Sequence, residues 1–586
     1  MTYRNPSGLL AALLLVSCST APREMPRSVS APHDVAPRSA LTSQPAAAPV
    51  SSAPLLVVVI VDQLAEWVMN ERLASLSTDG AFARLRREGL FVHELRYEHA
   101  TTSTAPGHAA LFSGLPPRES GIYANERLDP RSHKAVSILA DDTTRLVTDP
   151  SVADSSSSAA LMRGATLADA LREQAPNAWI VSISLKDRAA IFGGGRHPTA
   201  SIWFDVERGA FVTSSAFAEQ LPPWVGEQRS ALARARVSRW EPLDAAWLRG
   251  HAPTADDQAG EGDLGAGTRF PYDLSLSKAP NRVFRGTPLA DDSVLDLGLA
   301  ALASREREQP ALLVLSLSAF DYVGHVTGPE SWESWETLRR LDLKLANFLL
   351  EVERLSRGHF SVLLTADHGA PPLPETAGSA QARSWCQSSQ PDYFERPCDA
   401  GGRLYRDELE RALRPAAQAA LGKGDWIEGV VEPFVYYTPA VAALTPARRA
   451  KLDAACTQAL ARYPEVARVF AKSNRAASCP EPADQTLDAL VCRSLPDGAG
   501  DLYIATRPGS FFDPNLARGR GVNHGSPHLY DRTVPLFVRS ADLNRAGEEQ
   551  TGPVRPSDFT ATAAARLGIQ PPAGAALGRD LLGASR

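Results

Sequence analysis

Continuous runs of apolar, mostly β-branched residues recur along the chain and predict strands that are buried on both faces. The first run covers residues 55–61, and similar runs cover residues 179–184, 312–318 and 359–365. Strands of this kind belong to parallel sheets whose two faces are covered by helices. Stretches with helical periodicity separate the runs, so the pattern predicts an α/β fold.

A long amphipathic helix is expected over residues 335–355. Its apolar residues recur at steps of three and four, which places them on one face of a helix. They are Leu338, Leu341, Leu345, Phe348, Leu349 and Val352. This helix should pack on the predicted sheet through that face.

Two intervals of mixed sequence interrupt the alternation of strands and helices. They span about residues 129–286 and 371–519 and contain Pro and Gly without a clear period. We expect them to be cap insertions within one catalytic domain that runs from residue 55 to residue 586. A chain of 586 residues with 44% apolar composition can bury the large core that such a domain needs.

The first 18 residues predict a signal peptide. Arg4 precedes an apolar run over residues 9–16, which is too short to span a bilayer. The run ends in Leu15-Val16-Ser17-Cys18, which resembles the lipobox of bacterial lipoproteins and implies cleavage before Cys18 and acylation of its thiol. Ordinary cleavage beside an incidental cysteine is the alternative.

Residues 19–54 are rich in Pro, Ala and Ser and have no apolar period, so they predict a disordered tether. Ser19, rather than Asp, follows Cys18, which favours the outer membrane over the inner membrane. We therefore expect a lipoprotein in the periplasm or at the cell surface, most plausibly on the outer membrane. Cys18 would be its one membrane contact.

The formal net charge of −6 and the isoelectric point near 6.1 argue against a nucleic-acid partner or a polybasic membrane surface. A small anionic substrate would therefore be bound by local groups rather than by a basic face. We expect a monomer.

Five cysteines follow Cys18, all in the last third of the chain, and a signal peptide would place them in an oxidising compartment. Cys386 and Cys398 would close a short loop. Cys492 would pair with Cys456 or with Cys479, and the sequence leaves this choice open. A thiolate zinc site is a weaker alternative because the chain has no Cys-x-x-Cys pair.

Each of three predicted strands is followed by a carboxylate, namely Asp62, Asp321 and Asp367. The carboxyl ends of parallel strands meet in one crevice, so these groups should lie together. Three carboxylates in one crevice repel one another unless a cation neutralises them. A single Asp after a strand is often only a helix N-cap, and the set of three is what indicates a metal site.

Histidines supply further candidate ligands at His325, His368 and His524. The four-residue step from Asp321 to His325 brings both side chains to one tight turn, and Gly324 makes a regular helix less likely there. Carboxylate and imidazole ligands without thiolates suit two zinc ions, which can stabilise the attacking and leaving oxygens of an in-line displacement.

The candidate nucleophile is Thr104, in a polar run over residues 101–104 that leads into Ala-rich sequence. A helix that starts there would point its N-terminus at an anion. A threonine hydroxyl is a poor nucleophile, so a metal ion would have to activate it. The alternative is that these hydroxyl groups only cap the helix.

An ordered set of motifs resembles the phosphate-irrepressible alkaline phosphatases, which are close relatives of the nucleotide pyrophosphatase/phosphodiesterases. The set extends over the chain from about residue 55 to the Gly578-Arg579-Asp580 motif. Its members are Asp62-Gln63, Thr104-Ala105-Pro106-Gly107-His108, Asn125, Lys186-Asp187-Arg188, Asp321-Tyr322-Val323-Gly324-His325, Asp367-His368-Gly369 and His524-Gly525-Ser526.

The resemblance implies an alkaline-phosphatase-like fold, with a mostly parallel central sheet flanked by helices and with cap insertions. It also implies two Zn²⁺ ions. One zinc would be held by Asp62, Thr104, Asp367 and His368, and the other by Asp321, His325 and His524. Asn125, Lys186 and Arg188 would bind the phosphoryl oxygens of the substrate.

The activity implied by this resemblance is hydrolysis of small-molecule phosphate monoesters through a phosphothreonine at Thr104. A phosphodiesterase or nucleotide pyrophosphatase on the same metals is the nearest alternative, and Lys186 and Arg188 argue against it because they match the extra charge of a monoester. A sulfatase is disfavoured because the sequence after Thr104 lacks the formylglycine motif. A non-catalytic binding lipoprotein is the remaining alternative.

Overall fold

The computed structural model describes residues 53–583 apart from a few short segments. Those segments are residues 150, 151, 153, 377–400, 482–485, 514–517 and 542–544. The described residues belong to one unit, Ser52–Arg586. The signal peptide, the tether, Cys18, Cys386 and Cys398 lie outside the described residues, so the predictions for them stay predictions.

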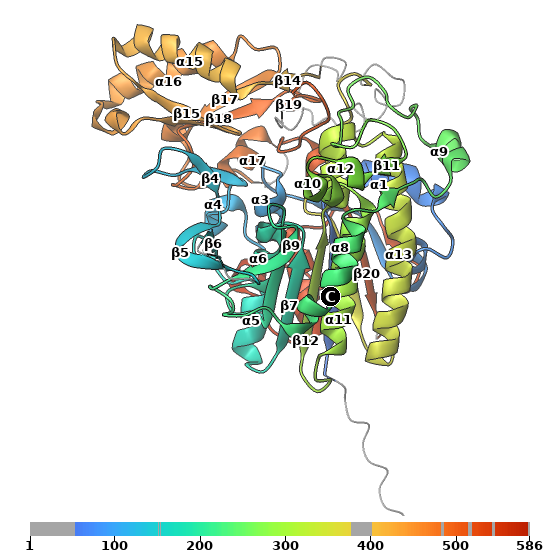
Figure 1. The fold of residues 1–586 in the computed structure, drawn as a ribbon. Helices are drawn as coiled ribbons and strands as arrows, with labels where there is room; N and C mark the ends of the chain where they lie inside the picture. The colour runs from blue at the N-terminus through green and yellow to red at the C-terminus, as the bar shows by residue number, and fades with distance from the viewer. Residues whose placement is uncertain are drawn as a thin grey trace, which may run out of the picture. The chain divides into compact units, whose positions relative to one another are not determined.

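An eleven-stranded sheet forms the centre of the fold (Figure 1). Five neighbouring strands in its middle run parallel to one another, whereas the strands that flank them on both sides are antiparallel to them. In spatial order the strands are β21 (Glu548–Gln550), β2 (Leu90–Arg96), β20 (Thr533–Ser540), β13 (Ser361–Thr365), β1 (Leu55–Val61), β12 (Ala311–Leu317), β7 (Trp179–Ser184), β8 (Ala200–Asp205), β9 (Ala210–Ser214), β5 (Ala140–Val147) and β6 (Ser155–Ser157).

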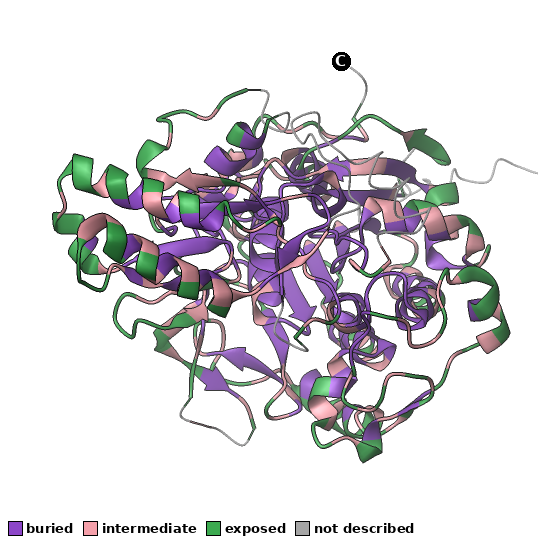
Figure 2. Ribbon diagram, turned by 90° about the horizontal axis from the view of Figure 1, so that it is seen from above, coloured by how far each residue is buried: buried purple, intermediate pink, exposed green. Residues whose placement is uncertain are grey.

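The four strands predicted from apolar runs are β1, β7, β12 and β13, and every residue in them is buried. Figure 2 shows this buried centre beneath helices whose outer faces are exposed. Their apolar composition follows from having helices on both faces of a parallel sheet. The predicted α/β fold with a mostly parallel sheet is confirmed.

Helices flank the sheet and carry their apolar residues inward. The predicted amphipathic helix is α13 (Trp332–Ser356), and all six of its predicted apolar residues are buried. It packs against α11 (Pro288–Ala303), which in turn packs on β12 and β7. A second helix, α19 (Pro556–Leu567), packs on β1 and on α3 (Thr104–Ser113).

A smaller antiparallel sheet lies within residues 371–519, the second predicted insertion. Its strand order is β15 (Ile427–Val431), β16 (Phe434–Tyr437), β18 (Leu502–Thr506) and β17 (Val466–Ala471). Two helices, α15 (Arg406–Leu421) and α16 (Pro446–Leu460), lie side by side and share a hydrophobic core with this sheet (Figure 1).

Residues 129–286, the first predicted insertion, contain five strands of the central sheet as well as excursions from it. Strands β5 to β9 occupy one end of that sheet, and β7 lies directly beside β12. The excursions include α9 (Ala245–His251) and α10 (Pro280–Arg285). Residues in this interval therefore reach the carboxyl ends of the parallel strands.

Cys492 forms a disulfide with Cys479, which decides between the two partners that the sequence left open. Cys456 is a buried free thiol in the hydrophobic core between α15, α16 and the small sheet. Among the described residues, no helix is long and apolar enough to cross a membrane.

Candidate active site

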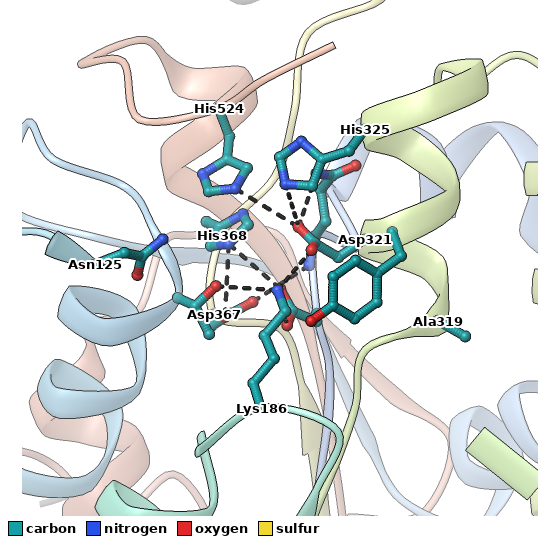
Figure 3. A network of polar contacts seen from close by, with 12 residues as sticks. Asn125, Lys186, Ala319, Asp321, His325, Asp367, His368 and His524 are labelled. Atoms are coloured by element: carbon teal, nitrogen blue, oxygen red, sulfur yellow. Dashed lines mark hydrogen bonds and ion pairs between the residues drawn. The ribbon is translucent and has the colours of Figure 1, made fainter. Parts of the chain in front are cut away.

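The candidate site lies at the carboxyl ends of four neighbouring parallel strands. Asp367 and His368 follow β13, Asp62 follows β1, Asp321 follows β12 and Lys186 follows β7. Because these strands are adjacent and in register, four chain segments far apart in sequence end at one edge of the sheet. Figure 3 shows the side chains of Lys186, Asp321, Asp367 and His368 pointing toward one another.

The first candidate metal group consists of Asp62, Asp367 and His368, whose ligand atoms lie within 4.8 Å of one another. His368 Nε2 is 3.4 Å from Asp62 Oδ1 and 3.6 Å from Asp367 Oδ2. All three side chains are fully buried. The family resemblance implies the same three residues, together with Thr104, as the ligands of one zinc ion.

The second candidate metal group centres on Asp321. Asp321, His368 and His524 also have ligand atoms within 4.8 Å of one another. His325 Nε2 is 3.3 Å and His524 Nε2 is 3.6 Å from Asp321 Oδ1. His325 comes from the same helix as Asp321, α12 (Ala319–Thr327), so the expectation that Gly324 disfavours a regular helix here is wrong.

The three histidines present Nε2 to the carboxylates because Nδ1 of each ring is engaged by a backbone carbonyl. The carbonyl partners are those of Gly369 for His368, Val522 for His325 and Thr102 for His524. A carbonyl can only accept, so these contacts place the proton on Nδ1 and leave the Nε2 lone pair free. Such hydrogen bonds are typical of metal-ligating histidines.

Several buried atoms of the site are suited to a metal ion. Asp62 Oδ1 and His368 Nε2 form no hydrogen bond within the described part of the chain, although both are fully buried. Buried polar atoms without a partner are costly, and a bound cation would satisfy them. Carboxylate oxygens and imidazole nitrogens are a fitting ligand set for zinc.

Electrostatics within the site also favour a cation. Burial raises the pKa of Asp62 well above its usual value, and the negative charges of Asp321 and Asp367 raise it further. Burial lowers the pKa of His524 well below its usual value, as do neighbouring His368 and His325. The histidine is thereby held in the neutral form that binds metals.

Thr104 is the first residue of α3 and is fully buried beside these groups. Its hydroxyl accepts a hydrogen bond of 3.2 Å from Lys186 Nζ. The same ammonium lies 2.6 Å from Asp62 Oδ2 and 2.5 Å from Asp321 Oδ2. Lys186 therefore links the expected nucleophile to one carboxylate of each candidate metal group.

Asn125 and Arg188 lie at the edge of the site. Asn125 Oδ1 accepts a hydrogen bond of 2.9 Å from Ala105 N in the first turn of α3, which leaves the amide N–H groups available. Arg188 Nη1 is 3.8 Å from Asp187 Oδ1, and Arg188 Nε is buried without a hydrogen bond within the described residues. The structure thus brings Asn125 to the nucleophile and leaves donors of Arg188 unengaged.

Two supporting residues belong to the motifs described above but were given no role from sequence. Gln63 Nε2 donates a hydrogen bond of 2.9 Å to Asp321 Oδ1, and Gln63 has a backbone φ of 70° that a non-glycine residue rarely adopts. His108 Nδ1 is 2.9 Å from the Thr104 carbonyl and 3.1 Å from Asp367 Oδ2. Only the positions of these residues, directly after Asp62 and one helical turn after Thr104, could have indicated such roles.

Residues 56–526 match the model of the type I phosphodiesterase / nucleotide pyrophosphatase family. The chain belongs to this family. Family membership and the two candidate metal groups together support hydrolysis of phosphate esters at a metal site.

The chain is similar in sequence to proteins that are named alkaline phosphatases. It is 27% identical to alkaline phosphatase PafA of Elizabethkingia meningoseptica, over 89% of this chain and 92% of the relative. It is 29% identical to alkaline phosphatase PhoK of Sphingomonas sp., over 82% of this chain and 83% of the relative.

The fold is also similar to that of an alkaline phosphatase. The crystal structure of wild-type alkaline phosphatase PafA matches with a TM-score of 0.77 and 25% identity, covering 92% of this chain and 100% of that chain. The chain is therefore a PafA-like member of the alkaline phosphatase superfamily, as its motifs predicted.

Proposed function

We propose that this chain is a zinc-dependent phosphate monoester hydrolase with Thr104 as its nucleophile. The observation that carries the proposal is the position of Lys186 Nζ, 3.2 Å from Thr104 Oγ1 in a buried site. A phosphoryl group joined to that oxygen would place one of its other oxygens beside the ammonium. A monoester dianion has more unshielded charge than a diester and gains more from such a contact.

Two zinc ions would be held by the residues that the sequence indicated. Asp62, Thr104, Asp367 and His368 would hold one, and Asp321, His325 and His524 would hold the other. When bound, these ions would supply positive charge to the attacking and leaving oxygens and lower the pKa of the nucleophile.

The chain's own residues then carry out two in-line displacements. Thr104 Oγ attacks phosphorus and forms a phosphothreonine, while the leaving alkoxide departs and takes up a proton. Water next attacks the same phosphorus, releases inorganic phosphate and restores the threonine hydroxyl. The helix dipole of α3 would favour the anionic phosphoryl group at Thr104. Of the next N–H groups, Ala105 N is bonded to Asn125 Oδ1 and Gly107 N to the Ser103 carbonyl, and Pro106 has none.

Substrate binding would use three side chains around the phosphoryl group. The Asn125 amide is oriented by its bond to Ala105 N, so its N–H group can donate to a phosphoryl oxygen. Lys186 is buried, and although burial lowers its pKa, the charges of Asp321 and Asp62 outweigh burial and keep it protonated. Arg188 adds a planar fork with an unengaged N–H.

The family model also covers phosphodiesterases, so diester hydrolysis is the second candidate function. The discriminating experiment compares zinc-loaded protein on an aryl phosphate and on the methyl diester of the same aryl phosphate. We expect a higher kcat/KM for the monoester. A preference for the diester would overturn the proposal and support the phosphodiesterase.

We also propose that the enzyme is a lipoprotein of the outer membrane, acylated at Cys18. This proposal rests on the lipobox-like Leu15-Val16-Ser17-Cys18 and on the Pro-rich sequence that follows it. A tether of this composition would let the catalytic domain act at a distance from the lipid anchor.

A further inference from the structure

A third positively charged side chain, in addition to Lys186 and Arg188, lies next to the candidate site. It belongs to an element that no motif indicated. Arg285 is the last residue of α10 (Pro280–Arg285). Its guanidinium carbon lies 4.3 Å from the centre of the Tyr322 ring, and its Nη1 is 3.4 Å from the Tyr322 hydroxyl. Tyr322 directly follows Asp321, so Arg285 packs against the backbone segment that carries a proposed metal ligand.

Lys186 lies against the same ring. Its Nζ is 5.2 Å from the centre of Tyr322 and 3.2 Å from Thr104 Oγ1. Tyr322 is thus shared by the ammonium that contacts the nucleophile and by the guanidinium of Arg285. Arg285 therefore adds positive charge to the rim of the site, one aromatic ring away from Lys186.

Arg285 has no anionic partner of its own within the described residues. Its polar contact there is a long hydrogen bond of 3.4 Å to the Tyr322 hydroxyl. By contrast, Arg282 on the same helix lies 3.5 Å from Glu207 Oε1. A half-buried guanidinium has five N–H donors, and leaving most of them without an acceptor is unfavourable unless water or a ligand supplies one.

The element that carries Arg285 is anchored in the core, so the guanidinium is held near the site. Val283 and Phe284 are buried, and the Phe284 ring lies 5.5 Å from the Phe204 ring. A Cβ at Gly286 would be 3.7 Å from Tyr322 Cβ, which shows how closely the chain passes Tyr322 at the end of α10. A side chain positioned in advance loses less entropy when it binds a ligand.

We propose that Arg285, held against Tyr322, binds a second anionic group on the leaving group of the substrate. The favoured substrates would be phosphate monoesters that carry a carboxylate or a further phosphoryl group. A guanidinium fork matches either oxyanion through paired N–H donors. This inference rests on the proposed monoesterase activity of the same site and names its substrate class.

The test uses three aryl phosphates that differ in one substituent of the leaving group. 3-Carboxyphenyl phosphate and 3-phosphonophenyl phosphate carry the second anion, and 3-carbamoylphenyl phosphate carries a neutral group of similar size. kcat/KM is measured for each with the zinc-loaded full chain and with Arg285→Ala. Dividing each anionic value by the neutral one removes effects of the variant that all three substrates share.

We expect Arg285→Ala to lower the ratio of anionic to neutral kcat/KM by about tenfold, the scale of one charge-assisted contact in a partly exposed site. A drop for the carboxylate alone or for the phosphonate alone would support the subsite and identify its anion. Arg285→Gln should give a similar loss, which guards against a folding defect specific to alanine. Arg282→Ala, on the same helix, is the matched control and should leave the ratio unchanged.

Two results would overturn the inference while leaving the monoesterase in place. One is an unchanged kcat/KM on all three substrates in both Arg285 variants. The other is an equal loss on all three substrates, which leaves the ratio unchanged and would mean that Arg285 supports the reacting phosphoryl group or the fold. If the wild-type protein hydrolyses none of the three esters, the proposed function itself fails, and this inference fails with it.

Discussion

Lys186 Nζ donates a hydrogen bond to Thr104 Oγ1 over 3.2 Å, although 82 residues separate the two in sequence. The end of β7 and the start of α3 meet at this contact. Lys186 also bridges Asp62 and Asp321, so one side chain connects the nucleophile with both candidate metal groups.

Thr104→Ala should abolish turnover and leave the fold and the metal content largely intact. The substitution removes the attacking oxygen, and the remaining ligands of both metal groups stay in place. We expect kcat to fall by at least about 10³-fold, as for other catalytic nucleophiles. Thr101→Ala is the matched control, because Thr101 is a buried threonine of the same segment whose hydroxyl has no hydrogen bond within the described residues. Activity retained in Thr104→Ala would refute the assignment.

Removing either imidazole beside Asp321 should lower metal occupancy as well as rate. His325→Ala and His524→Ala each delete one of three proposed protein ligands of one zinc ion. The loss of zinc affinity should exceed the 10- to 100-fold that changes around metal ligands usually cause. Zinc per chain is measured by elemental analysis after dialysis, with His251→Ala at the exposed end of α9 as control. Full zinc occupancy in both variants would place that ion elsewhere.

The Lys186→Ala/Arg188→Ala double variant should lose monoesterase activity selectively. Each contact to an unshielded phosphoryl oxygen is worth roughly 1.5 to 3 kcal/mol, so monoester kcat/KM should fall by about two to four powers of ten. Diester kcat/KM should fall far less, because a diester has one oxygen fewer to bind.

Both substrates are measured at the same pH and zinc concentration, with Lys344→Ala on α13 as a control for loss of a lysine. An equal fall on monoester and diester would mean that Lys186 and Arg188 support the metals or the fold. The monoesterase proposal would then lose its main physical support.

Glu261 should make the protein less stable as the pH rises. Burial, followed by the negative charge of Glu333, raises the pKa of Glu261 from 4.5 to about 9. Between those values the folded state binds a proton that the unfolded chain has released, so the free energy of unfolding falls as pH rises from about 4.5 to about 9. Asp256 and Asp257 add negative charge nearby and act in the same direction.

Glu261→Gln should flatten this pH dependence and be more stable than the wild type at pH 9 by at least about 1 kcal/mol. Denaturant unfolding at pH 5, 7 and 9 measures the effect. The isosteric amide keeps an acceptor for the bond from Gln258 N. Glu308→Gln, at an exposed position, is the control. Parallel pH profiles for wild type and Glu261→Gln would show that Glu261 is ionised in the folded state.

Cys18→Ala should prevent acylation and change where the protein is found. The variant should leave the detergent-soluble membrane fraction or accumulate with its signal peptide uncleaved. Fractionation with immunoblotting, together with the mass of the mature N-terminal peptide, measures both. Unaltered fractionation and processing would support ordinary secretion instead of a lipid anchor.

The sequence alone was sufficient to predict four of the five parallel strands and the helix over residues 335–355, which the structure extends to Trp332–Ser356. Burial on both faces favours apolar residues at every position of β1 and at every position of β12 except Ser316, and an amphipathic helix requires a step of three or four. Both requirements concern residues that are close together in sequence, so the sequence of each segment is enough to recognise them. The same logic placed Asp62, Asp321 and Asp367 together, because parallel strands end at one edge of a sheet.

Contacts between distant segments were decided only by the tertiary structure. The order of strands brings Lys186 beside Asp321 and places Arg285 against Tyr322, and neither contact has a signature in the spacing of the residues. The interval over residues 129–286 likewise contains both excursions and strands of the central sheet, because the chain enters the interior of that sheet at β7, between β12 and β8.

For the cysteines and the site histidines too, the sequence predicted one part and the tertiary structure decided the other. Composition and spacing narrowed the partner of Cys492 to two candidates, and only the folded chain brings Cys479 to it while burying Cys456. Residue types indicated His325 and His524 as candidate ligands, whereas carbonyl groups of Val522 and Thr102 set which ring nitrogen faces Asp321. Residue type and periodicity are properties of the sequence, but pairing and orientation depend on distances between segments that only folding brings together.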